Sequence, residues 1–185
     1  ERLWPYQDNP EWVLHSTSPI PGVDLYDYRV ELMAKQIRCL FGEVPASLDD
    51  YALASQTVQA EAMKFFIERF RMDRAVRSGI VWWNLLDGWP QLSDAVVDYY
   101  FVKKLAYQVI RRVQQPLVVS LAEPEAGRSA VVACSERREG VEVEWAITDV
   151  ASDERVAAGK NQAPGESATQ LGHVAMPGGV QRLLR

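Results

Sequence analysis

The residues best suited to chemistry lie in one stretch, 80-IVWWNLLDGWPQ-91, in which three tryptophans surround an amide and an acid. An indole face can stack on the C–H face of a sugar, and amide and carboxylate groups can bind its hydroxyls. Trp83, Asn84, Asp87 and Trp89 are therefore candidate carbohydrate-binding residues. The same types also fit a buried strand whose tryptophans pack on helices, and the stretch alone leaves both interpretations open. Trp82 would point away from Trp83, into the core.

Other combinations carry weaker signals. His15 and His173 have no neighbours at metal-ligand spacing, so the sequence predicts no metal site. Asp94 and Asp98 could form the carboxylate pair of a hydrolase, but their spacing does not show that they face each other. There is no phosphate-cradling glycine loop, dinucleotide fingerprint or nucleophile elbow, so no cofactor is expected.

The elements that would position the tryptophan stretch come from hydrophobic periodicity. Helical spacing predicts helices over about 25–41 and 47–74, the second opened by a capping box at Ser47, and a third over about 101–114. Between them, 79–83 reads as a strand buried on both faces. This order is typical of an α/β barrel or a doubly wound sheet, and residues that follow a barrel strand form the active-site face.

The pattern changes after Pro116, where short strand-like runs at 117–123, 129–136, 141–150 and 154–160 are separated by turns. The third run alternates strictly between apolar and polar residues, so one of its faces should be exposed to solvent. Several such runs at this spacing predict an antiparallel sandwich.

Composition narrows the classes of partner. The 185 residues carry a net charge of −5 and no basic block, which argues against a nucleic-acid surface. No apolar run is long enough to predict a membrane span, and the first residues of the chain do not have the pattern of a signal peptide. A soluble protein, cytoplasmic rather than secreted, is expected. Cys39 and Cys134 are expected to be buried free thiols. Because the chain begins at Glu1 without methionine, we expect it to start partway into a longer gene product.

Two longer runs, 55-SQTVQAEAMKFFIERFR-71 and 78-SGIVWWNLLDGWPQLSDAVVDYYFVKKLAYQVIRR-112, carry a family resemblance. They resemble the last part of the catalytic barrel of glycoside hydrolase family two, most closely its β-mannosidase-like branch. The resemblance implies the C-terminal portion of a (β/α)8 TIM barrel over residues 1–115. An incomplete immunoglobulin-like β-sandwich would follow over residues 116–185.

The family resemblance also implies a function. The parent would be a retaining β-glycosidase that hydrolyses terminal β-glycosidic bonds with two glutamates from earlier barrel strands. No catalytic residue is expected in this chain, since Glu1 lacks the context of the family's nucleophile, so the isolated chain should be inactive. Trp83 matches the floor of the sugar subsite, Asn84 and Asp87 the polar positions beside it, and Trp89 the rim.

Leu86 stands where β-mannosidases often carry Asn, so the resemblance does not determine which sugar is bound or whether the parent is active. Besides a carbohydrate substrate, the expected partner is the rest of the parent chain or a second copy, because part of a barrel leaves strand edges unpaired. The alternatives are a non-catalytic carbohydrate-binding or interaction module and a purely structural domain.

Overall fold

The structure is a computed structural model that describes residues 4–5 and 28–176. The chain divides into two compact units. One, here called the helical unit, comprises residues 1–65 and 81–112, and the other, the sheet unit, comprises residues 66–80 and 113–185. Within the described residues, no helix combines the length and the apolar character needed to cross a membrane.

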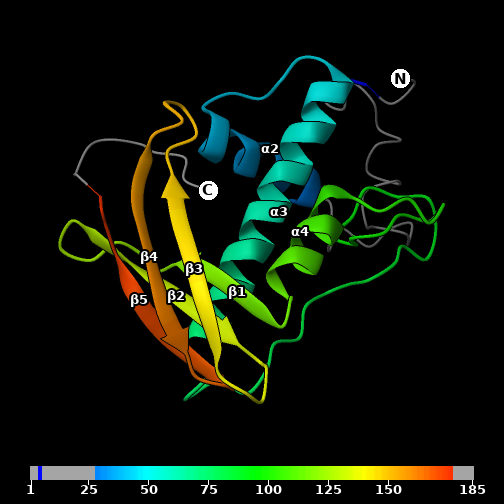
Figure 1. The fold of residues 1–185 in the computed structure, drawn as a ribbon. Helices are drawn as coiled ribbons and strands as arrows, with labels where there is room; N and C mark the ends of the chain where they lie inside the picture. Colours follow the sequence, from blue (N-terminus) through cyan, green and yellow to red (C-terminus); the bar gives the residue numbers. More distant parts are fainter. Residues whose placement is uncertain (1–3, 6–27, 177–185) are drawn as a thin grey trace. The chain divides into compact units, whose positions relative to one another are not determined.

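Three helices are described, α2 (Tyr28–Phe41), α3 (Leu48–Met72) and α4 (Leu105–Val113), and they correspond to the three that periodicity predicts (Figure 1). The predicted cap of α3 is confirmed, because the Ser47 hydroxyl accepts a hydrogen bond from the Asp50 backbone N–H at 3.1 Å. The Asp50 carboxylate accepts from the Ser47 hydroxyl at 2.7 Å, which links the two side chains directly.

Helix α4 begins later than the predicted residue 101 because residues 98–102 form a tight turn. One oxygen of the Asp98 carboxylate, Oδ1, accepts the backbone N–H groups of Tyr100 and Val102, each at 2.8 Å. Phe101 in this turn has a φ of 65°, which no residue inside a right-handed helix adopts. The helix can therefore start only beyond the turn, at Leu105.

Helices α2 and α3 pack against each other in the helical unit through one small core, made of Ala34, Ile37, Tyr51 and Ala54. The prediction that Cys39 is buried is wrong, since its side chain is exposed. The physical reason is helical geometry: Cys39 lies two residues after Ile37, about 200° around the helix and so on the opposite face. Cys134 is buried as predicted.

The prediction of a buried strand at 79–83 is wrong. No strand of the described residues pairs with this segment, and the side chains of Val81 and Trp83 are 96% and 79% exposed. An apolar run is buried on both faces only when strands flank it and helices cover it, and the described residues supply neither. Chain pairing begins further on, with a parallel bridge between Leu86 and Val97 and an antiparallel one between Val97 and Lys103.

The sheet unit contains two antiparallel sheets (Figure 1). One has the order β1-β2-β5 and the other pairs β3 with β4; their bounds are Leu117–Leu121 (β1), Arg128–Ser135 (β2), Val141–Thr148 (β3), Arg155–Ala163 (β4) and Ser167–Ala175 (β5). Four of these strands match the predicted runs. β5 was not predicted, because its Gly172 and His173 interrupt the alternation of apolar residues.

Both sheets contribute to one shared apolar core, which contains Val131, Ala133, Val143, Trp145, Ile147, Ala163, Leu171 and Val174. The predicted alternation of β3 is confirmed, since Val143, Trp145 and Ile147 are buried while Glu142 and Glu144 are exposed. The chain therefore joins a largely helical unit to a unit in which β1 to β5 are all paired antiparallel.

Trp145 fills the centre of this core. Its indole lies over two glycines, and a Cβ atom added at Gly159 or Gly172 would come within 2.8 Å or 2.9 Å of the ring. Its N–H donates to Asn161 Oδ1 at 2.8 Å, which satisfies the one polar atom of the side chain. The two glycines are thus required by close approach of the ring.

The last turns of α3 belong to the sheet unit and bind the end of β2. Arg71 donates to the carbonyl of Val113 and forms an ion pair with Glu136 at 3.3 Å. Arg74 donates to the carbonyl of Ser135 at 2.8 Å. Guanidinium groups from the last turn of α3 (Arg71) and from the turn that follows it (Arg74) therefore satisfy main-chain acceptors beside the sheet.

Candidate functional site

The tryptophan stretch is continued by a loop that folds back on itself in three short passes. Val96 N–H donates to the carbonyl of Asn84 at 3.2 Å, and Val97 N–H to that of Leu85 at 2.9 Å. Asp87 N–H then donates to the carbonyl of Val97 at 3.1 Å, and Lys104 N–H to that of Val96 at 2.9 Å. Residues 84–87, 96–97 and 103–104 therefore lie side by side and fix the base of the loop.

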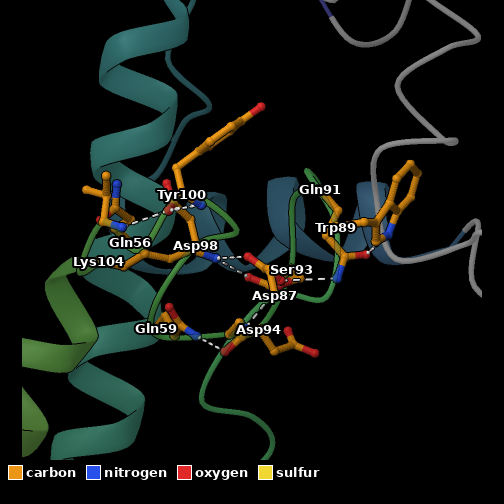
Figure 2. A network of polar contacts seen from close by, with 12 residues as sticks. Gln56, Gln59, Asp87, Trp89, Gln91, Ser93, Asp94, Asp98, Tyr100 and Lys104 are labelled. Atoms are coloured by element: carbon orange, nitrogen blue, oxygen red, sulfur yellow. Dashed lines mark hydrogen bonds and ion pairs between the residues drawn. The ribbon is translucent and has the colours of Figure 1, made fainter.

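Asp87 lies at the centre of the loop, and its side chain is 0% exposed. Figure 2 shows the groups that converge on it: Lys104 Nζ lies 3.2 Å from Oδ2, while Gln91 Nε2 donates to Oδ1 at 3.1 Å and the Ser93 hydroxyl donates to the same oxygen. A buried carboxylate is tolerated only when it is paired and hydrogen-bonded, and both conditions are met here. The carboxylate therefore faces the interior of the loop.

Trp89 is attached to this network through Gln91. Its indole N–H donates to Gln91 Oε1 at 2.8 Å, and the other end of the same amide binds Asp87 (Figure 2). The Trp89 side chain is half-buried. Its position thus depends on the carboxylate at the centre of the loop.

Trp83 and Asn84 lie at the start of the loop, joined by a cis peptide bond. The Trp83 side chain is exposed, whereas Trp82, expected in the core, is half-buried. The Asn84 Oδ1 atom is buried and accepts no hydrogen bond from the part of the chain that the structure describes. A buried carbonyl oxygen without a donor is costly, so this amide can accept a hydrogen bond from a bound group.

A cavity of about 530 Å³ lies within the helical unit, between α2, α3 and the loop. Trp83 lines it, while Asn84, Asp87 and Trp89 do not. Its polar lining includes glutamines of both helices, Gln36, Gln56 and Gln59. Gln56 Oε1 accepts the N–H of Leu105 at 2.9 Å, and Gln59 Nε2 donates to the carbonyl of Asp94, so two of these amides hold the loop (Figure 2). The size and mixed lining suit a small polar ligand.

The remaining candidates are placed differently. Asp94 and Asp98 both line the cavity, but the Asp98 carboxylate organises the 98–102 turn. His15 lies outside the described residues, and His173 is an exposed residue of β5. The described residues contain no cluster of His, Cys, Asp and Glu that could hold a metal ion.

Sequence reasoning missed the partners of Asp87. Lys104, Gln91 and Ser93 were not candidates, although Lys104 is the second of two lysines in the run 98-DYYFVKKLAY-107. An acid placed among apolar and aromatic residues needs a cation once it is buried. That requirement was the available signal, but it does not show which of the two adjacent lysines supplies the charge.

No family model matches the chain. Among curated proteins it is 38% identical over 77 residues to β-mannosidase B of Aspergillus niger and 36% identical over 77 residues to that of Aspergillus flavus. Each match covers 40% of this chain and 9% of the relative. The chain therefore spans only a small part of the length of these relatives.

Solved structures give a likeness of fold. The β-D-mannosidase of Dictyoglomus thermophilum matches with a TM-score of 0.71 and 24% identity, over 80% of this chain and 18% of the other. An exo-chitosanase of Amycolatopsis orientalis matches with a TM-score of 0.64 and 15% identity, over 87% and 19%. The resemblance to the β-mannosidase-like branch of glycoside hydrolase family two, expected from the sequence motifs, is thus confirmed.

Proposed function

We propose that the chain supplies part of the sugar-binding surface of a retaining β-glycosidase of the β-mannosidase type, which hydrolyses terminal β-glycosidic bonds. The catalytic glutamates would come from elsewhere in the enzyme, so the chain alone would be inactive. In this proposal residues 1–115 form the end of a (β/α)8 barrel and residues 116–185 part of an immunoglobulin-like sandwich. The curated relatives are β-mannosidases, which supports mannose as the first sugar to test.

The observation that carries the proposal is the exposed indole of Trp83 at a cavity of about 530 Å³ with both polar and apolar lining. A large exposed aromatic ring costs free energy in water unless a ligand or partner covers it, and a sugar presents a matching C–H face. In this proposal Asn84, the next residue, lies outside the lining of the cavity and contributes its unpartnered oxygen as a further acceptor for a sugar hydroxyl. Asp87 and Trp89 would serve the same surface, the first by holding the loop and the second as its rim.

The test is direct binding by the 185-residue chain. Methyl β-D-mannopyranoside and methyl β-D-glucosaminide are titrated while tryptophan fluorescence and backbone NMR shifts are recorded. Trp83→Ala should abolish the shifts of residues around the cavity and weaken binding at least about tenfold, because stacking on the ring is lost. Tyr100→Ala removes another exposed aromatic ring of the helical unit that does not line the cavity, and it should bind as the unaltered chain does.

Activity is tested in a longer polypeptide that carries this chain, with nitrophenyl β-D-mannopyranoside as substrate. Hydrolysis that falls with Trp83→Ala would support the proposal. Binding without hydrolysis would instead favour a non-catalytic carbohydrate-binding module. The absence of any binding by the chain and of hydrolysis by the longer polypeptide would contradict the proposed function.

An interaction module is a second candidate, and one observation favours it. Val81, Trp83 and Leu85 are all exposed, so several large apolar side chains lie close together along one exposed segment. The partner would be the rest of the parent chain or a second copy. Sedimentation of the chain over a concentration series tests self-association, and Val81→Asp should then weaken it.

A further inference from the structure

Lys104 and Asp87 form the most deeply buried ion pair of the described residues. The side chain of Asp87 is 0% exposed and that of Lys104 17%, whereas the side chains of Lys64 and Glu61 in another pair are 36% and 56% exposed. Burying a cation costs free energy of desolvation, which is offset only when its partners are held in a fixed geometry. The contacts of Lys104 show which parts of the loop are held.

Lys104 touches three parts of the loop. Its backbone N–H donates to Val96, and its ammonium group lies 3.2 Å both from Asp87 Oδ2 and from the carbonyl of Ser93. The Ser93 hydroxyl closes a ring of contacts by donating to Asp87 Oδ1. One side chain thus connects the first pass of the loop with the last.

The two aromatic residues of the loop depend on this ring of contacts through short chains of bonds. Trp89 is bound to Gln91, and Gln91 to Asp87. Trp83 precedes residues 84–87, and this pass is held by hydrogen bonds from Asp87 N–H to the carbonyl of Val97 and from Val97 N–H to the carbonyl of Leu85. Loss of the ammonium group would free the Asp87 side chain and so weaken the attachment of both ends of the tryptophan stretch.

We propose that Lys104 is a positioning residue: through Asp87 it fixes the 83–97 loop in the conformation that presents Trp83 to the cavity. It does not touch the sugar in this proposal. The inference rests on the proposed sugar-binding function for its consequence, but the positioning itself can be measured without any sugar.

The first measurement is amide hydrogen exchange of the 185-residue chain, residue by residue. Lys104→Met keeps the length of the side chain and removes its charge. The amides of Asp87, Val96 and Val97 should exchange at least about tenfold faster, while those of α2 should not change, because only the loop opens. Lys64→Met removes a lysine from an exposed pair in the same unit and should leave all of these rates unchanged.

A second variant separates positioning from stability. Lys104→Met with Asp87→Asn removes both charges, so no unpaired carboxylate stays buried and the melting temperature should recover toward that of the unaltered chain. The loop amides should still exchange fast, and affinity for methyl β-D-mannopyranoside should remain at least about tenfold weaker at a temperature where all variants are folded.

Loop amides that keep their exchange rates in both variants would overturn the positioning role, whatever the sugar does. Fast loop exchange with undiminished sugar affinity would also overturn it, because presentation of Trp83 would not depend on the loop. Fast loop exchange in chains that never bind sugar, with or without Lys104, would support the positioning of the loop and contradict the proposed function.

Discussion

The sheet unit and the helical unit bury their residues in different ways. In the sheet unit, the inner faces of two sheets meet in one core around Trp145, and outward positions of β3 are charged. In the helical unit, many large apolar side chains are exposed, among them Leu53, Phe65, Val81, Trp83, Leu85 and Phe101, while a carboxylate is buried. The order of the sheet unit thus rests on apolar packing, and that of the tryptophan loop rests on polar contacts.

The comparison predicts where a large side chain matters most for stability. Trp145→Ala should lower the free energy of unfolding by about 3–5 kcal/mol, because it leaves a cavity in the shared core of the two sheets. Urea unfolding followed by far-UV circular dichroism measures the loss. Trp83→Ala, a change of the same chemistry at an exposed position, should cost less than about 0.5 kcal/mol. Equal costs would mean that the contrast between the two units is not real.

A smaller difference in stability is expected between alanine substitutions at two glycines, one in each unit. A Cβ atom at Gly165, beside β4, would lie 2.1 Å from the carbonyl oxygen of Arg138, and main chain cannot move away cheaply. Gly165→Ala should therefore destabilise the chain by about 1–3 kcal/mol. At Gly88, in the loop of the helical unit, nothing lies within 4 Å of the added atom. Gly88→Ala should leave the urea midpoint unchanged, and a matching loss there would contradict the open surroundings of the loop.

The smallest effect is expected in the rates at which the two thiols are alkylated. At pH 8, iodoacetamide should modify exposed Cys39 of the helical unit at least about tenfold faster than buried Cys134 of the sheet unit. Burial raises the pKa of the Cys134 thiol above its ordinary value of 9.0, against a smaller opposing effect of the Arg71 charge. Mass spectrometry of labelled peptides over time measures both rates. Similar rates in the folded chain would show that the sheet unit opens readily.

The raised pKa of Cys134 also determines whether the stability of the folded chain rises or falls with pH. The unfolded chain releases the Cys134 proton at lower pH than the folded chain does, so this group leaves stability unchanged below pH 9 and reduces it as pH rises above that value. Cys134→Ala should remove this part of the alkaline loss. The comparison is made on urea midpoints at pH 8 and at pH 10.

The sequence predicted the elements whose pattern depends on local neighbours. The alternation of β3 and the cap at Ser47 are set by residues a few positions apart, and both are confirmed. The strand at 79–83 was wrong because an apolar run records a preference for burial and not the presence of strands beside it. The exposure of Cys39 was missed because the sequence does not show which face of α2 meets α3.

For the site, residue types drew attention to the tryptophan loop but did not predict which of its residues contact one another. Asp87 looked like a group for binding hydroxyls, yet its oxygens are occupied by Lys104, Gln91 and Ser93. Those contacts depend on how residues 84–104 fold back in three passes, and no local periodicity encodes that. Trp83 lines the cavity, and its role in binding a sugar stays a prediction.

The guanidinium contacts at the end of α3 bear on whether the sheet unit can exist as a separate module. Because residues 66–80 belong to the sheet unit, its chain is discontinuous, with the 81–112 segment inserted between its two parts. A shorter gene that began at Val113 would encode β1 to β5 but lack Arg71 and Arg74, and the carbonyls of Val113 and Ser135 would lose these donors. The unit could therefore not be exchanged between proteins by a single crossover near Pro116; recombination would have to carry the end of the helix along with the sheets.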